Sequence, residues 1–137
     1  ALVEKYDLQG HVTLHGRLFG EPLEELYRLC TIGIDILGGH RKDFPVSSTL
    51  KSREYGAWGL PLVTSSPVDF MGTDCPWQHL VPYDDSPVDI HAMLRYYHET
   101  YGDADTVAKA IRDFSYGKCH MPITMEPVVR WLLEEQA

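Results

Sequence analysis

The sequence predicts an α/β fold in which helices flank a parallel sheet. Three observations lead to this prediction: short strand-like apolar runs alternate with helical patterns, glycine and proline separate them, and the most β-branched run is apolar on both faces. The chain has 137 residues, of which 44% are hydrophobic, and this is enough for one core. We therefore expect a single domain over residues 1–137.

The first third of the chain is predicted to form a strand, a helix and a second strand. Apolar and polar residues alternate in the first segment, a proline and an apolar stripe at helical spacing mark the second, and β-branched residues dominate the third. The predicted elements are a strand over His11–His15, a helix from Pro22 to about Cys30 and a strand over Thr31–Leu37.

A second helix is predicted in the middle of the chain. Ser47 and Ser48 offer hydroxyl groups that can cap its amino end, and the helix then runs to about Trp58. Gly59 can adopt the left-handed conformation that ends a helix.

Two short strands and a helical region complete the predicted fold. The strands are Leu60–Ser65 and His79–Pro82. From Ser86 onward, three apolar stripes recur at helical spacing. The stripes consist of Ile90, Met93, Leu94 and Tyr97; of Val107, Ile111 and Phe114; and of Met125, Val128, Val129 and Leu132.

The amino-acid composition indicates which partners and which cellular compartment to expect. Twelve Lys and Arg against 20 Asp and Glu give a net charge of −8, which repels polyanions, so we expect no nucleic-acid partner. Three widely spaced cysteines without a Cys-x-x-Cys motif fit a reducing compartment, the cytoplasm. The cysteines and histidines lack the compact paired spacing of structural zinc sites, so no metal or other cofactor is expected.

The loop before the second helix is the most informative charged segment. Residues 40–53 carry Arg41, Lys42, Asp43, Lys51 and Arg53, a local excess of positive charge in an acidic chain. This segment leads into a helix amino end, whose free N–H groups favour an anion such as a phosphate. Glu54 lies roughly 9 Å along the helix from Ser48. That separation suits a carboxylate that binds ribose hydroxyls while the helix start holds a diphosphate.

The same residues resemble a known family. The segment Ser48–Ser65 contains Lys-x-x-Glu-Tyr, small residues and then Gly-Leu-Pro-Leu-Val-Thr-Ser, and it resembles a segment of GT-B glycosyltransferases of the group 1, or family 4, type. Weaker matches follow in the family's order on both sides. These matches are Val12–Gly16, Leu26-Tyr27, Ile32–Ile34, Leu80–Asp85 and Phe114–Tyr116.

The resemblance implies the carboxy-terminal, donor-binding half of a two-domain enzyme, with a Rossmann-like parallel sheet that lacks its first strands. Such an enzyme transfers a sugar from a nucleotide-diphosphate sugar to a glycan or lipid-linked acceptor. The acceptor would bind through the amino-terminal domain, so this chain is expected to be inactive alone. The implied setting is cytoplasmic polysaccharide or glycolipid synthesis, with the full-length protein either free or peripheral to the membrane.

The resemblance also assigns roles to individual residues. Glu54 would bind the ribose hydroxyls, and Lys51 would face the diphosphate together with the backbone N–H groups around Thr49 and Leu50. The turn at Gly16 and Arg17 would lie beside the base. The resemblance implies neither a metal nor a nucleophile in this half, and the catalytic residues are left unassigned.

Two departures from the family pattern keep an alternative open. Val46 stands where many members have a second Glu, and the family's first two strands have no counterpart. An uncovered sheet edge would then require strand exchange, self-association or helices packed over the gap. The alternative function is a non-catalytic α/β interaction module that has lost the donor site.

Overall fold

A parallel three-stranded sheet lies at the centre of the structure, a computed structural model that describes residues 2–134. The strands occur in the order β1-β2-β3, with parallel pairing throughout. The strands are β1 (Gly33–Ile34), β2 (Leu62–Thr64) and β3 (Gln78–Leu80). The helices are α1 (Leu2–Lys5), α2 (Glu21–Leu29), the 3-10 helix η1 (Gly39–Lys42), α3 (Leu50–Trp58), α4 (Ile90–Thr100), α5 (Ala104–Cys119) and α6 (Met121–Glu134). The predicted mixed α/β class is confirmed at this level.

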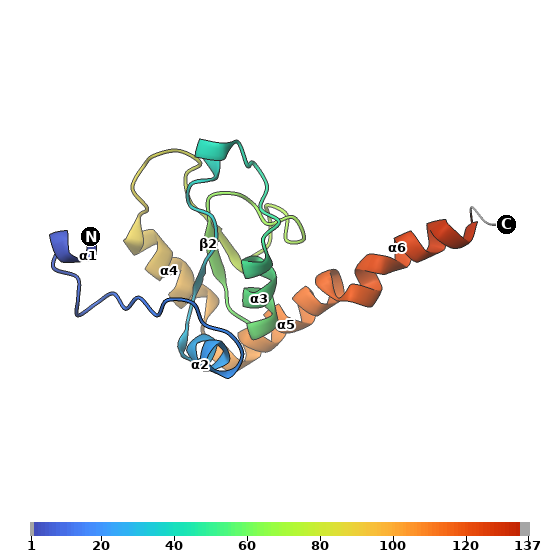
Figure 1. The fold of residues 1–137 in the computed structure, drawn as a ribbon, viewed down its shortest axis with the longest axis horizontal. Coiled ribbons are helices and arrows are strands. Elements are labelled where there is room, and N and C mark those ends of the chain that lie inside the picture. The colour runs from blue at the N-terminus through green and yellow to red at the C-terminus, as the bar shows by residue number, and fades with distance from the viewer. Residues whose placement is uncertain (1, 135–137) are drawn as a thin grey trace.

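Helices cover both faces of the sheet. The register places Gly33 beside Leu62 and Ile34 beside Val63, and successive residues of a strand point to opposite faces. Gly33 packs against the Tyr55 ring of α3, whereas His79 of β3 stacks on Tyr96 of α4, with ring centroids 5.0 Å apart. Figure 1 shows α3 and α4 on opposite sides of β2.

The hydrophobic core lies between the sheet and the layer formed by α3 and α5. Leu62 and Val68 are fully buried, and Met71 and Cys75 complete the cluster. Burial of a side chain such as Leu62 contributes about 1.5–3 kcal/mol to stability. The partly buried rings of Tyr55, Phe70, Trp77 and Phe114 surround the cluster.

Residues directly next to α3 determine where this helix begins and ends. The backbone N–H of Ser52 donates to Oγ1 of Thr49 at 3.3 Å, so Thr49 is the cap. The predicted caps were therefore one or two residues too early, because Ser47 and Ser48 donate their hydroxyls to acidic residues instead. Gly59 ends the helix with φ 75°, as predicted.

The predicted strand over His11–His15 was wrong. This segment has no regular structure, and Leu14 in it is 80% exposed. Figure 1 shows it as an extended stretch between α1 and α2, away from the sheet. A strand needs a neighbour for its backbone groups. The edge of β1 is no such neighbour, since its outward Ile34 carbonyl accepts a hydrogen bond from the Tyr55 hydroxyl at 3.1 Å.

The strand predicted over Thr31–Leu37 is shorter and less covered than expected. Only Gly33–Ile34 pairs as a strand, at the edge of the sheet. Ile34 is 47% exposed and Leu37 is 37% exposed, so the expectation of a strand buried on both faces was wrong. A β-branched run cannot distinguish a central strand from an edge strand, because that depends on which segments pair with it.

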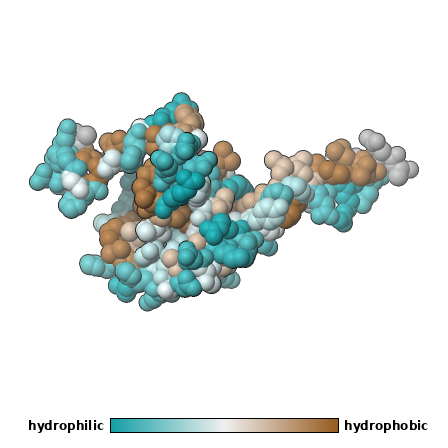
Figure 2. Space-filling view, turned by 90° about the horizontal axis from the view of Figure 1, so that it is seen from below, coloured by the Kyte–Doolittle hydropathy of each residue, from teal (hydrophilic) through white to brown (hydrophobic). Residues whose placement is uncertain are grey.

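The last helix, α6, projects from the rest of the structure. Its predicted stripe exists, but Met125, Val128, Val129 and Leu132 are each between 41% and 49% exposed. Figure 2 shows hydrophobic residues on this projecting part. The stripe correctly predicted the helix but not a packing partner. Within residues 2–134, no helix is both long and apolar enough to cross a membrane.

Candidate functional site

The carboxyl ends of β1 and β2 meet at one polar edge. The backbone N–H of Ser65 donates to the Ile36 carbonyl at 2.6 Å, and the hydroxyls of Ser65 and Thr64 donate to the same oxygen at 3.0 and 3.1 Å. These contacts fix the loop after β1 against the end of β2. In open parallel sheets, ligands bind at this edge, so the loops leading to α3 are held where a ligand could approach.

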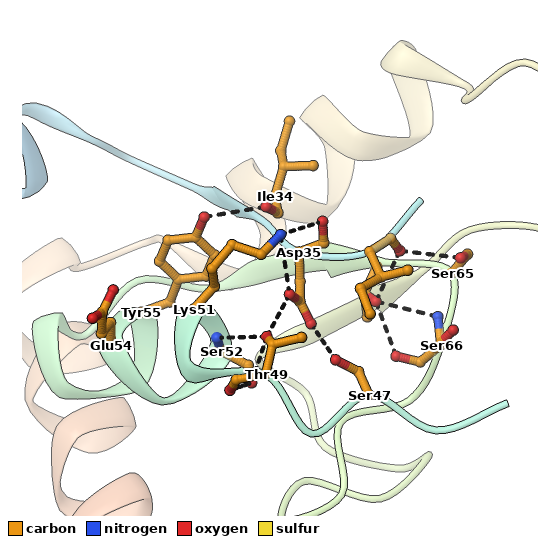
Figure 3. Close-up of polar contacts among 12 residues, drawn as sticks. Ile34, Asp35, Ser47, Thr49, Lys51, Ser52, Glu54, Tyr55, Ser65 and Ser66 are labelled. Atoms are coloured by element: carbon orange, nitrogen blue, oxygen red, sulfur yellow. Dashed lines mark hydrogen bonds and ion pairs between the residues drawn. The ribbon is translucent and has the colours of Figure 1, made fainter. Parts of the chain in front are cut away.

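A buried carboxylate, that of Asp35, organises the start of α3. Its side chain is inaccessible to solvent. Ser47 donates to it at 2.5 Å and Thr49 at 2.7 Å. Figure 3 shows these side chains converging at the amino end of α3. Asp35 is not among the residues predicted for the site, although an acidic residue inside a β-branched run is a signal in the sequence that could have identified it.

Lys51 completes this cluster. Its Nζ donates to the Asp35 carbonyl oxygen at 2.8 Å and lies 3.3 Å from Oδ1 of the same residue. The lysine side chain is 48% exposed, so the ammonium group is held at the protein surface and balances the buried charge. The cation predicted to face a diphosphate is therefore already paired with a carboxylate.

Glu54 lies one turn further along α3 and points elsewhere. It is exposed, as its predicted role requires. Its Oε2 accepts a hydrogen bond from the Tyr27 hydroxyl of α2 at 2.7 Å. Figure 3 shows the Glu54 side chain directed away from the cluster of Lys51 and Asp35. The structure thus places the two predicted donor-binding side chains on one short helix without bringing them together.

An aromatic cluster holds Tyr27 against α3. Its ring stacks on Trp58 with centroids 5.7 Å apart and meets Tyr55 edge-on at 6.1 Å. The Arg28 guanidinium lies 5.3 Å from the centroid of the Trp58 ring. Burial, followed by the hydrogen bond to Glu54, raises the pKa of Tyr27. The phenol therefore remains a proton donor at neutral pH.

Two other basic residues of this segment, Arg53 and Arg41, are also paired. Arg53 forms an ion pair with Asp69 at 2.7 Å, and Arg41 forms one with Asp85 through both Nε and Nη2. Burial acts to raise the pKa of Asp69, but hydrogen bonds from Ser48 and Arg53 and the positive charge of Arg53 outweigh it and lower the pKa. The positive excess seen in the sequence is thus largely neutralised by carboxylates from other parts of the chain.

Some backbone N–H groups in the first turn of α3 form no hydrogen bond with the described residues. Among the residues described, the N–H groups of Thr49, Leu50 and Lys51 donate to no other group, and Leu50 is 77% exposed. Such N–H groups carry the positive end of the helix dipole. Within the described residues, the protein itself therefore does not use the N–H groups of Thr49 and Leu50 that were predicted to bind a phosphate.

The remaining predicted site residues lie apart from this region. Gly16 has φ +69°, which fits the predicted turn, but Gly16 and Arg17 belong to the exposed segment before α2. The Arg17 guanidinium lies 5.2 Å from the centroid of the Phe19 ring. In the described part of the chain, no hydrogen bond or ion pair joins Arg17 to α3.

The described residues were examined for groups that could bind a metal ion, and the chain was compared with known proteins. Residues 2–134 contain no cluster of three or more His, Cys, Asp or Glu able to hold a metal ion. No family model, curated protein or solved structure matches the chain.

A cavity of about 530 Å³ lies between α3 and α5, lined by residues that include Arg53, Arg112 and Cys119, and it contains none of the predicted donor-binding residues.

Proposed function

We propose that this chain is the donor-binding domain of a GT-B glycosyltransferase, with a Rossmann-like sheet that holds a nucleotide-diphosphate sugar. The observation that carries the proposal is the start of α3. Unbonded N–H groups from Thr49 to Lys51 lie at the carboxyl edge of a parallel sheet, and the exposed carboxylate of Glu54 follows on the same helix. The resemblance of Ser48–Ser65 to the family's donor-binding segment supports the same function.

The roles of the residues follow from their chemistry. The N–H groups would bind the diphosphate, and the free Oε1 of Glu54 would accept hydrogen bonds from ribose hydroxyls. As the sugar departs, charge develops on the diphosphate, and fixed backbone dipoles stabilise that charge without reorganising. Lys51 would contribute through its half-exposed ammonium, whose orientation is set by Asp35. The acceptor, a glycan or a lipid-linked glycan, would bind to a second domain.

Binding of nucleoside diphosphates tests the proposal. Isothermal titration calorimetry with UDP, GDP and ADP up to millimolar concentration should show binding of at least one of them. The Glu54→Gln variant should weaken this binding about tenfold, because hydrogen bonds to a charged group contribute about 1.5–3 kcal/mol. Glu126→Gln is the matched control, since within residues 2–134 the Glu126 carboxylate is paired only with Arg130 of the same helix, α6. If wild-type protein binds none of the three nucleotides, the proposal fails.

A specific observation favours a second function, a non-catalytic interaction module. Lys51, Arg53 and Arg41 are all paired with carboxylates of the same chain. The buried Asp35 also already supplies a negative charge beside the amino end of α3, which weakens the attraction for a phosphate. This function predicts that UDP, GDP and ADP leave the melting temperature and the amide NMR spectrum unchanged.

A further inference from the structure

We infer that Tyr27 positions Glu54 and thereby gives the donor site its selectivity for a ribose over a sugar without 2′- and 3′-hydroxyls. This inference rests on the proposed function. The hydrogen bond of 2.7 Å from the Tyr27 hydroxyl occupies Oε2 of Glu54. Among the described residues, Oε1 accepts no hydrogen bond, so it is the oxygen left for the ribose.

The tyrosine is well suited to fix the direction of this carboxylate. An exposed glutamate samples several rotamers, and ordering it on ligand binding costs free energy. Stacking on Trp58 and the edge contact with Tyr55 hold the Tyr27 ring in place. The phenol then donates a charge-assisted hydrogen bond, which is stronger than a neutral one. The carboxylate is thus oriented before the nucleotide arrives.

The contact also joins two elements that are far apart in sequence. Tyr27 belongs to α2 and Glu54 to α3, 27 residues later. The helix α2 follows directly after the segment with Gly16 and Arg17, the predicted base-binding turn. Tyr27 packs α2 against α3, so a shift of the turn with Gly16 and Arg17 can move α2 and thereby change the position of the Glu54 carboxylate.

The test compares ribonucleotides with their dideoxy analogues. Wild-type chain and the Tyr27→Phe variant are titrated with UDP, GDP and ADP and with the corresponding 2′,3′-dideoxynucleoside diphosphates. Phenylalanine keeps the ring and removes only the hydroxyl. We expect Tyr27→Phe to weaken binding of the ribonucleotide about fivefold, which is the usual effect of one hydrogen bond. Binding of the dideoxy analogue should remain unchanged, so the preference for ribose falls by the same factor.

Two controls separate positioning from a structural effect. Tyr97→Phe removes a hydroxyl from another half-buried tyrosine, which lies in α4 and stacks on Tyr101, and should leave binding unchanged. The double variant Tyr27→Phe/Glu54→Gln should bind no more weakly than Glu54→Gln alone, because Tyr27 acts through Glu54.

The outcomes distinguish this inference from the proposed function. If a ribonucleotide binds and Tyr27→Phe leaves its affinity unchanged, the inference is overturned while the donor-site function survives. An equal loss for the ribonucleotide and its dideoxy analogue also overturns it, since the hydroxyl would then matter for packing and not for ribose. If no nucleotide binds to the wild-type chain, both fail.

Discussion

Lys51 and Asp35 form a contact that joins a helix to the neighbouring strand end. The lysine Nζ lies 2.8 Å from the Asp35 carbonyl oxygen and 3.3 Å from Oδ1, while the aspartate side chain has no contact with solvent. A buried carboxylate is costly unless it is paired and hydrogen-bonded. The family resemblance implies that Lys51 faces a diphosphate, whereas in the structure Lys51 is paired with a buried carboxylate.

Removal of the Asp35 carboxylate should destabilise the fold. In Asp35→Ala, the hydroxyls of Ser47 and Thr49 lose their acceptor and Lys51 loses its ion pair. We expect the free energy of unfolding to fall by about 2–4 kcal/mol, as measured by urea denaturation. Asp74→Ala is the control, because among the described residues exposed Asp74 accepts a hydrogen bond only from the adjacent Thr73, and this variant should change stability by less than about 0.5 kcal/mol. Equal stability of the two variants would contradict the assigned role of Asp35.

The crossing of α3 and α5 depends on the absence of a side chain at Gly56. A Cβ at this position would lie 2.3 Å from Oγ of buried Ser115. Gly56→Ala should therefore lower the free energy of unfolding by about 1–3 kcal/mol, the usual cost of overpacking. Gly102→Ala is the matched control, because a Cβ there meets nothing within 4 Å. Thermal unfolding measures both, and a Gly56→Ala variant as stable as wild type would show that the helices do not cross this closely.

Stability should fall in acid, partly because of Asp69. Its pKa is lowered in the folded state by Ser48 and Arg53. The stabilising contribution is therefore complete above the unfolded pKa of about 3.9 and is lost as the pH falls through the lower folded value. Asp69→Asn should be less stable than wild type at pH 7, and the difference should shrink below about pH 4. A difference that stays constant from pH 7 to pH 3 would show that the charge of Asp69 is not involved.

Self-association is expected at the open edge of the sheet. Ile34 at this edge is 47% exposed, and an exposed apolar side chain can be buried against a second copy of the chain. Light scattering after size-exclusion chromatography should detect a concentration-dependent dimer, and Ile34→Lys should weaken it. Leu132→Glu is the comparison variant, because it disrupts the exposed stripe of α6 instead. A monomer at every concentration, or a dimer sensitive only to Leu132→Glu, would contradict association through this edge.

Patterns that depend on neighbouring residues in the chain predicted the structure well. The apolar spacing placed α2 and the three carboxy-terminal helices. Hydroxyl residues before the helix and Gly59 after it placed α3, and Gly59 ends α3 with a left-handed conformation as expected. The β-branched and apolar runs located all three strands of the sheet to within a few residues. Helix periodicity and helix-ending glycines are local properties, so a single sequence carries them.

Tertiary structure decided which residues pair, and the sequence could not. The alternating segment His11–His15 has the pattern of a strand but no neighbour to bond with, and it stays extended and exposed. Asp35, Asp69 and Asp85 come from separate segments, yet each neutralises a basic residue of the positively charged segment 40–53. Tyr27 reaches Glu54 across 27 residues. Charge on a loop is a property of the sequence, but the charge that a ligand meets depends on which side chains the fold brings together.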